Sequence, residues 1–174
     1  MSHTTGIGVI RGFLCFFLVM GMWFITRNSA TFDEPMHYYA GHAYLERGDF
    51  AVSYQLPPLS KEIAVLPVYL LSHLHLIAAP HFTTAAENPT AGLDLLYRSP
   101  LSASVQLFLG RLPMLLLGLL TIIVIARWAY RLWGMPAAIV GTGLAVTEPT
   151  LIAHSSVITP DIALTGFFTL FFYL

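Results

Sequence analysis

The chain has 174 residues, of which 56% are hydrophobic and 10% are charged, and its mean hydropathy is +0.72. This composition excludes an ordinary soluble domain and is typical of an integral membrane protein. The net charge of -1, with basic residues spread singly, argues against a nucleic acid partner. The single cysteine, Cys15, excludes an intramolecular disulfide and leaves the redox compartment undetermined.

Apolar segments of spanning length recur along the chain. A spanning helix needs roughly 20 mostly apolar residues, because the hydrocarbon core is about 30 Å thick. We predict an all-α integral membrane protein, a polytopic helical bundle that forms one transmembrane module over residues 1–174. Its spanning helices are expected at residues 6–26, 106–128, 135–154 and 160–174, with a tight turn at Leu132-Trp133-Gly134. The last apolar segment has no polar flank after Leu174, so we expect the chain to be the N-terminal part of a longer protein.

Residues 59–79 are also apolar and long enough to span, but they contain Lys61, Glu62, Pro67, His73 and His75. If they lie along the interface, Arg11, Arg127 and Arg131 all fall on the cytoplasmic side, as the positive-inside rule prefers. If they span, the last two arginines fall on the side opposite the N-terminus. We therefore favour an interfacial helix.

This topology makes residues 27–105 a large first non-cytoplasmic loop that contains interfacial helices, and places the turn at 155–161 on the same side. All nine acidic residues then lie on that face. For residues 6–26, an uncleaved anchor is favoured over a cleaved signal peptide, because Asn28 stands where a small residue is required. The expected location is the cell (inner) membrane, as a multi-pass protein with its site on the non-cytoplasmic face.

A dense polar cluster, Asp33 to Tyr39, follows the first apolar segment. Asp33-Glu34-Pro35 predicts a helix start, because carboxylates cap helices and proline is tolerated in the first turn, and Gly48 predicts the helix end. A glycine inside a helix costs about 1 kcal/mol relative to alanine, so Gly41 indicates close approach of a neighbour or a ligand. The pattern alone fits capping and catalysis by Asp33 and Glu34 equally well.

Asp33 and His37 have an i, i+4 spacing that can coordinate a metal ion, and His42 adds a further nitrogen. No HExxH motif and no cysteine pair occurs in the sequence. We therefore predict no dedicated metal site.

Three further ionisable residues need an explanation. Arg111 lies inside an apolar helix, where a cation costs a few kcal/mol, so we expect a partner: Asp33, Glu34 or Asp161, or a substrate phosphate. Lys61 follows the Pro57-Pro58-Leu59 turn and could contact an anionic headgroup, snorkel to water or pair with an acid. Asp161 also fits a helix start.

In their order along the chain, these pieces resemble the membrane-embedded C-type glycosyltransferases that use a lipid-phosphate sugar donor, a group that includes protein O-mannosyltransferases and the aminoarabinose transferase of lipid A. The matching pieces are an apolar helix followed by Asp33-Glu34-Pro35-Met36-His37-Tyr38, then Gly48-Asp49-Phe50, Pro57-Pro58-Leu59 with Lys61, Gly110-Arg111-Leu112, and the turn at 155–161. Leu56 stands where many relatives carry histidine before the prolines.

The resemblance implies sugar transfer from a polyprenyl-phosphate donor to a protein or lipid acceptor at the outer membrane face, with inversion. It makes Asp33 the base, with Glu34 assisting. His37, Tyr38 and Asp161 would contact substrate, and Lys61 and Arg111 would balance the donor phosphate charge. Some relatives use a divalent cation, so the resemblance leaves the cofactor undetermined. The alternative is a transporter or a non-catalytic membrane subunit in which Asp33, Arg111 and Asp161 form an ion network.

Overall fold

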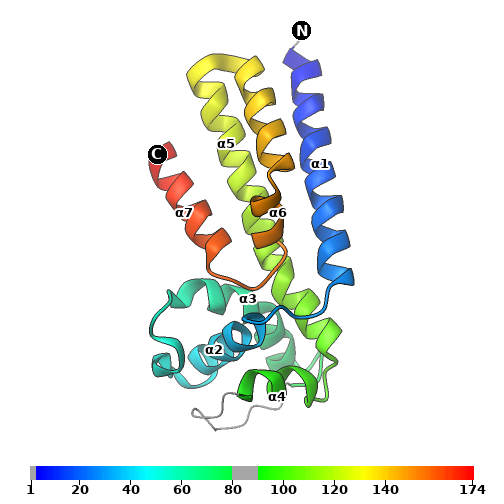
Figure 1. Cartoon of the computed structure of the whole chain (residues 1–174), viewed down its shortest axis with the longest axis vertical. Coiled ribbons are helices and arrows are strands. Elements are labelled where there is room, and N and C mark those ends of the chain that lie inside the picture. The colour runs from blue at the N-terminus through cyan, green and yellow to red at the C-terminus, as the bar shows by residue number, and fades with distance from the viewer. Residues whose placement is uncertain (1–2, 80–89) are drawn as a thin grey trace. The chain divides into compact units, whose positions relative to one another are not determined.

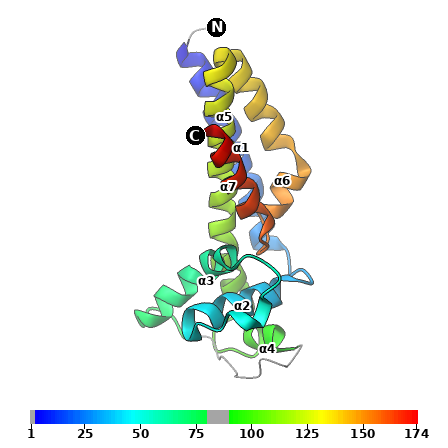
Figure 2. The ribbon, with the colours of Figure 1, turned by 90° about the vertical axis from the view of Figure 1, so that its left-hand side faces the viewer.

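The computed structural model describes residues 3–79 and 90–174, and every regular element in them is a helix (Figures 1 and 2). The expected all-helical fold is therefore confirmed. The elements in chain order are α1 (His3–Arg27), α2 (Glu34–Arg47), the short 3-10 helix η1 (Phe50–Ser53), α3 (Pro58–His73), α4 (Ala91–Tyr97), α5 (Ala103–Thr147), α6 (Pro149–His154) and α7 (Asp161–Tyr173).

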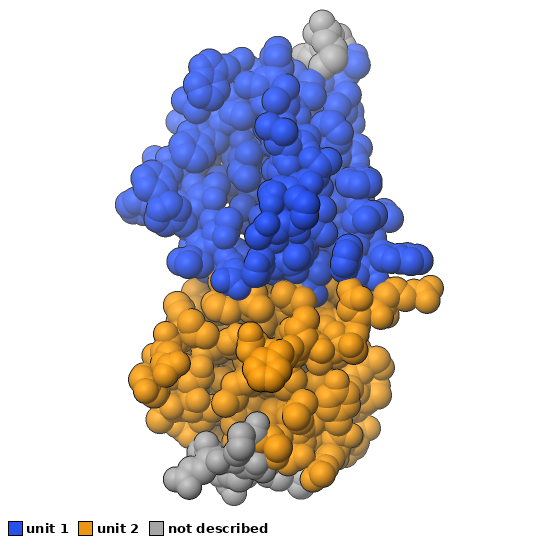
Figure 3. Space-filling model, in the orientation of Figure 1, with its two compact units in different colours: residues 1–24, 115–156, 161–174 blue, residues 25–114, 157–160 orange. Residues whose placement is uncertain are grey.

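The chain forms two compact units, coloured separately in Figure 3. Unit 1 contains Met1–Phe24, Leu115–Ser156 and Asp161–Leu174, and unit 2 contains Ile25–Met114 and Val157–Pro160. Each unit is assembled from segments that lie far apart in the sequence. Helix α5 begins in unit 2 and continues in unit 1.

Two described helices are long and apolar enough to cross a membrane, Thr4–Arg27 within α1 and Ala103–Thr147 of α5. Each contains an 18-residue window of high mean hydropathy, 2.0 in the first and 2.3 in the second. The α5 segment is broken at Gly134, where φ is 77° and ψ is -164°, so it consists of two helical arms. Only glycine adopts such a φ and ψ readily, which explains why the turn falls there. The multi-pass topology stays a prediction.

The helix expected over 135–154 is shorter than predicted. It stops at Thr147, and Glu148 is extended, with φ -74° and ψ 113°, before α6 begins at Pro149. The residue that precedes a proline is forced out of the helical region, which explains the break. The chain after α6 leads into α7, a helix of 13 residues.

Unit 2 is organised around α2, which contacts α3, α4 and η1. Helix α2 ends at Gly48 in the left-handed conformation, with Gly48 N–H donating to Tyr44 and Asp49 N–H donating to Ala43. Halfway along α2, a Cβ on Gly41 would collide with the carbonyl oxygen of Lys61 in α3. The predicted close approach at Gly41 is therefore real, and the neighbour is the backbone of α3.

The helix predicted over 59–79 also needs correction. Helix α3 begins at Pro58 and ends at His73, and residues 74–79 are not helical. The chain turns at His75, whose φ is 56°. An apolar composition continues past His73, but α3 has only 16 residues, which is fewer than the roughly 20 that a spanning helix needs.

Candidate site around the start of helix α2

The start of α2 carries two adjacent carboxylates with opposite environments. Glu34 is 0% exposed, whereas Asp33 is exposed to solvent. Asp33 occupies the position before the first helical residue, but its side chain makes no capping hydrogen bond. Capping therefore does not explain Asp33.

Glu34 forms a buried ion pair with Arg111, which is also 0% exposed. The Arg111 Nε donates to Glu34 Oε1 at 2.8 Å, and Nη2 donates to Glu34 Oε2 at 2.6 Å. This two-point geometry is the strong form of a carboxylate–guanidinium contact. Of the partners that the sequence left open for Arg111, the structure selects Glu34.

The remaining guanidinium hydrogens of Arg111 are also used. Nη1 donates to the carbonyl oxygens of Asn28 at 2.8 Å and Ile25 at 3.4 Å, and Nη2 donates to that of Ser29 at 2.8 Å. An arginine has five N–H donors, and all five are engaged. The expectation that Arg111 binds a donor phosphate is therefore corrected: it ties the segment before α2 to α5.

Glu34 also accepts hydrogen bonds from two other segments of unit 2. Its carboxylate accepts from the N–H of Thr31 at 2.8 Å, the hydroxyl of Thr31 at 3.2 Å and the N–H of Ile158 at 2.8 Å. Burial alone would raise the pKa of Glu34, but the hydrogen bonds from Arg111, Thr31 and Ile158 outweigh it and lower that pKa. Glu34 is a buried, ionised structural group, not an accessible base.

Asp33, in contrast, borders two surface hollows of unit 2. One, of about 470 Å³, is lined by residues that include Phe32, Met36 and Tyr97. The other, of about 280 Å³, lies against the loop from Val52 to Leu56. In the described part of the chain, no donor is recorded for the Asp33 carboxylate, which leaves it able to accept a proton from a bound molecule.

Lys61 does not reach the surface, and it pairs with no acid among residues 3–79 and 90–174. It is 1% exposed, and its Nζ donates to Ser53 Oγ at 2.7 Å, to Ser53 O and the Tyr44 hydroxyl at 3.2 Å, and to Leu56 O at 3.4 Å. Burial lowers the pKa of Lys61. The expected contact with a headgroup or phosphate is therefore corrected: Lys61 braces the loop that forms one wall of the second hollow.

His37 and Tyr38, which were expected to bind substrate, lie on different sides of α2. His37 is 8% exposed and lines the hollow beside Asp33. Tyr38 is 0% exposed and packs edge to face against His42, with ring centres 4.8 Å apart. Burial raises the pKa of Tyr38 far above its usual range, so this phenol stays neutral and belongs to the core.

Asp161 belongs to unit 1, where its partner is His154. Asp161 Oδ2 lies 3.1 Å from His154 Nδ1, and both side chains are partly exposed. The pair joins the end of α6 to the start of α7. The turn that precedes Asp161 still contributes to the Glu34 site in unit 2, through the N–H of Ile158.

Within residues 3–79 and 90–174, no group of three or more His, Cys, Asp or Glu side chains is arranged to hold a metal ion. The i, i+4 pair of Asp33 and His37 has no third ligand there. His42 is buried and 2% exposed, and it faces Tyr38. The described residues therefore do not fit a divalent cation, and we derive no chemical step through one.

The sequence reasoning missed two residues of this site, Thr31 and Ile158. Thr31 is recognisable, because Thr31-Phe32-Asp33-Glu34 has the Thr-x-x-Glu spacing in which a glutamate reaches back to a backbone N–H before a helix. Ile158 acts through its backbone, 124 residues after Glu34, and leaves no signal in the sequence.

No protein-family model, curated protein or solved structure matches the chain. The resemblance to lipid-phosphate glycosyltransferases therefore stays a prediction that rests on the motifs and their order.

Proposed function

We propose that the protein is a membrane glycosyltransferase that moves a sugar from a polyprenyl-phosphate donor to a protein or lipid acceptor at the outer face of the cell membrane. The observation that carries the proposal is the state of Asp33. It is an exposed carboxylate, uncommitted to capping, that borders two hollows beside a rigidly held helix start. The motif order around Asp33 supplies the reaction class.

In the proposed reaction, Asp33 takes the proton from the acceptor as the acceptor attacks the anomeric carbon of the donor. The bond between that carbon and the phosphate oxygen breaks, and the polyprenyl phosphate leaves with the electron pair. A single in-line displacement inverts the anomeric configuration. Of the two adjacent acids, Asp33 suits this role, because Glu34 is buried and held by Arg111.

Glu34 and Arg111 act as positioning residues in this proposal. Their pair fixes the segment before α2 to α5 and so sets where the Asp33 backbone lies. Lys61 is also a positioning residue. Through its hydrogen bonds to Ser53 and Leu56, it holds the loop that forms one wall of the second hollow beside Asp33. A fixed base matters, because a misplacement of about 1 Å can cost 100-fold in rate.

Substitution of Asp33 tests the assignment. In the full-length protein in native membranes, we expect Asp33→Asn to reduce transfer of a radiolabelled sugar from polyprenyl phosphate by at least about 100-fold, since an amide cannot accept the acceptor proton. The protein should still insert and accumulate as the wild type does.

Asp49→Asn is the matched control. Asp49 is another acid of unit 2, its side chain accepts from the Ala51 N–H at 3.1 Å, and asparagine can replace it in that contact. This control should transfer sugar at the wild-type rate. Full activity of Asp33→Asn would contradict the assignment of the base, and absence of transfer by the wild type with every polyprenyl-phosphate sugar tested would contradict the function.

The buried pair favours one alternative, a non-catalytic membrane subunit in which Glu34 and Arg111 form a structural ion network. The two functions differ in what Asp33 does. A structural subunit tolerates Asp33→Asn in every assay, because this exposed side chain holds nothing together, whereas the enzyme loses transfer.

A further inference from the structure

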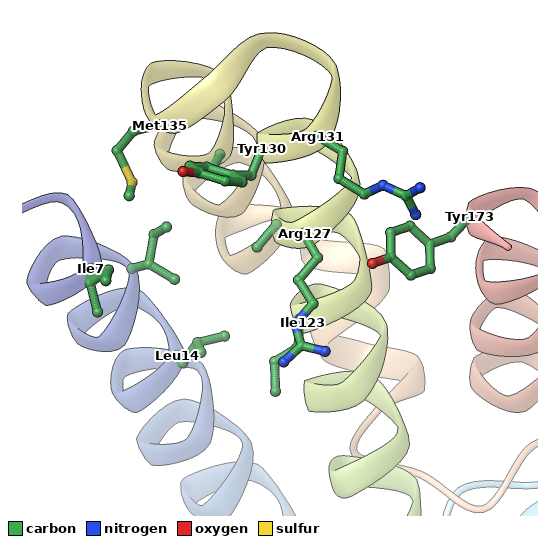
Figure 4. A pocket seen from close by; sticks show the side chains of 11 residues that line it. Ile7, Leu14, Ile123, Arg127, Tyr130, Arg131, Met135 and Tyr173 are labelled. Atoms are coloured by element: carbon green, nitrogen blue, oxygen red, sulfur yellow. The ribbon is translucent and has the colours of Figure 1, made fainter. Parts of the chain in front are cut away.

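Unit 1 has a slot between α1 and α5 that the proposed function does not use (Figure 4). Its volume is about 420 Å³. One wall is apolar and comes from α1, through Ile7, Ile10 and Leu14. The opposite wall comes from both arms of α5, and Tyr173 of α7 borders it.

Two arginines of α5, Arg127 and Arg131, line this apolar slot. They are four residues apart and so lie on one helix face. Arg131 extends toward Tyr173, with its guanidinium carbon 5.1 Å from the ring centre (Figure 4). Both residues are exposed.

Neither arginine has an acidic partner in the part of the chain that the structure describes. The ion pairs among the described residues do not include Arg127 or Arg131. The sequence explains why, since residues 1–32 and 95–147, which cover both candidate spanning helices, contain no Asp or Glu. Two cations beside an apolar slot, on helices long enough to span a membrane, therefore need an anion from outside the chain or direct access to water.

We infer that the slot binds an anionic phospholipid, with the lipid phosphate on Arg127 and Arg131 and one acyl chain against Ile7, Ile10 and Leu14. Guanidinium groups bind phosphate oxygens through paired N–H donors, and basic pockets between spanning helices suit anionic headgroups. A zwitterionic lipid would add its own cation beside the two arginines. A second copy of the chain, or an apolar helix, would cover the hydrophobic wall but leave both charges without a partner.

Native mass spectrometry of the full-length protein in a mild detergent tests the inference. The probes are phosphatidylglycerol and phosphatidylcholine with identical acyl chains. We expect preferential binding of phosphatidylglycerol, weakened about fivefold by Arg127→Gln and about thirtyfold by Arg127→Gln with Arg131→Gln, since each basic residue near a membrane surface contributes a similar attraction to anionic lipid.

Arg11→Gln is the matched control, because it removes the same charge from α1 at a residue that does not line the slot. It should leave phosphatidylglycerol binding unchanged. A further variant, Leu14→Trp, fills the apolar wall and should weaken binding of long-chain phosphatidylglycerol while sparing a short-chain analogue. All variants should elute from a size-exclusion column at the same volume as the wild type, which shows that they fold.

Several outcomes would overturn the inference. Equal binding of the two lipids would show that the slot does not distinguish an anionic headgroup from a zwitterionic one. An equal loss in Arg11→Gln and Arg127→Gln would show diffuse attraction instead of a site. Displacement of the lipid by inorganic phosphate alone would remove the role of the slot, and a dimer that excludes lipid would assign the slot to a second copy.

Discussion

The arginines of α5 form two contrasting groups on one helix. Arg111, in unit 2, is fully buried, and its five N–H donors are all taken by Glu34 and three backbone carbonyls. Arg127 and Arg131, in unit 1, are exposed and lie beside an apolar slot with no carboxylate partner among the described residues. The same residue type in the same helix is therefore committed in one place and available in the other.

The contrast shows that an ionisable residue in an apolar segment does not by itself indicate a ligand. What distinguishes the two cases is whether the fold supplies enough acceptors to replace water. Arg111 has them, so its role is structural. The described residues supply no such acceptors to Arg127 and Arg131, so these two guanidinium groups are available to a ligand from outside the chain.

Removal of Arg111 should give the largest effect. We expect Arg111→Met to lower the free energy of unfolding by about 3–5 kcal/mol, because Glu34 would remain as a buried, unpaired charge. Arg127→Gln, at an exposed residue, should change the free energy of unfolding by less than about 0.5 kcal/mol. Denaturant unfolding in detergent, followed by circular dichroism, measures both values. Comparable losses in the two variants would remove the contrast between the two groups.

A double-mutant cycle sharpens this prediction. Glu34→Gln should also be strongly destabilising, since it leaves the Arg111 charge buried without its counterion. The combination of Arg111→Met with Glu34→Gln should cost less than the sum of the two single substitutions, because neither charge is then left alone. Additive losses would show that the pair is not the interaction that holds the segment before α2.

His42 tests the same principle for a buried ring nitrogen that has no hydrogen-bond partner among the described residues. Its ring is 2% exposed, no hydrogen-bond partner is recorded for Nε2 within the described residues, and burial lowers the pKa of His42 to about 4. The unfolded chain takes up this proton near pH 6.5, before the folded chain does. Stability should therefore fall by about 3 kcal/mol as the pH decreases from 7 to 4.

The window between pH 6.5 and 4.5 isolates His42 from Glu34, because the pKa of Glu34 is lowered from 4.5 and its contribution is lost only at more acidic pH. A His42→Leu variant should lose less stability than the wild type in this window. Unfolding midpoints measured at half-unit pH steps give the slope. Parallel slopes for the two proteins would show that His42 is not buried in a neutral form.

Among the buried groups, Lys61 should give the smallest effect, because it is a cation that is satisfied by neutral oxygens. Lys61→Met keeps the length of the side chain but leaves Ser53, Tyr44 and Leu56 without their donor. We expect a loss of about 1–3 kcal/mol in the free energy of unfolding, the usual cost of unsatisfied buried polar groups. If Lys61→Met instead kept full stability and weakened binding of a lipid phosphate, Lys61 would contact an anionic headgroup, as the sequence allowed.

Local features of the fold were predictable because their causes are local. Pro35 and Gly48 mark the two ends of α2, and Gly134 breaks α5, since each residue has a backbone preference that acts without help from distant segments. Gly41 predicted a close contact, although not with which element. The end of α3 was missed because apolar composition continues past His73. The break at Glu148 was missed although its cause, Pro149, is local, because apolar residues on both sides favoured one continuous helix.

The candidate site was predictable only as a set of residue types. Arg111 required a partner, but Asp33, Glu34 and Asp161 were equally suitable by sequence. Asp33 and Glu34 differ by one position, which on a helix is a rotation of about 100° and separates a buried face from an exposed one. That rotation decides which of the two carboxylates meets Arg111 and which borders the hollows.

The sequence by itself determined that this is a helical protein with segments apolar enough for a membrane, that α2 starts and stops where it does, and that the cations of α5 have no acids on their own helix. Tertiary structure alone decided the rest. Contacts between Glu34 and residues 77 and 124 positions away depend on how whole helices pack, and burial of Lys61 depends on a loop folding over it. The sequence shows that charged residues in apolar segments cost desolvation free energy. Which polar atoms compensate that cost depends on how the helices pack.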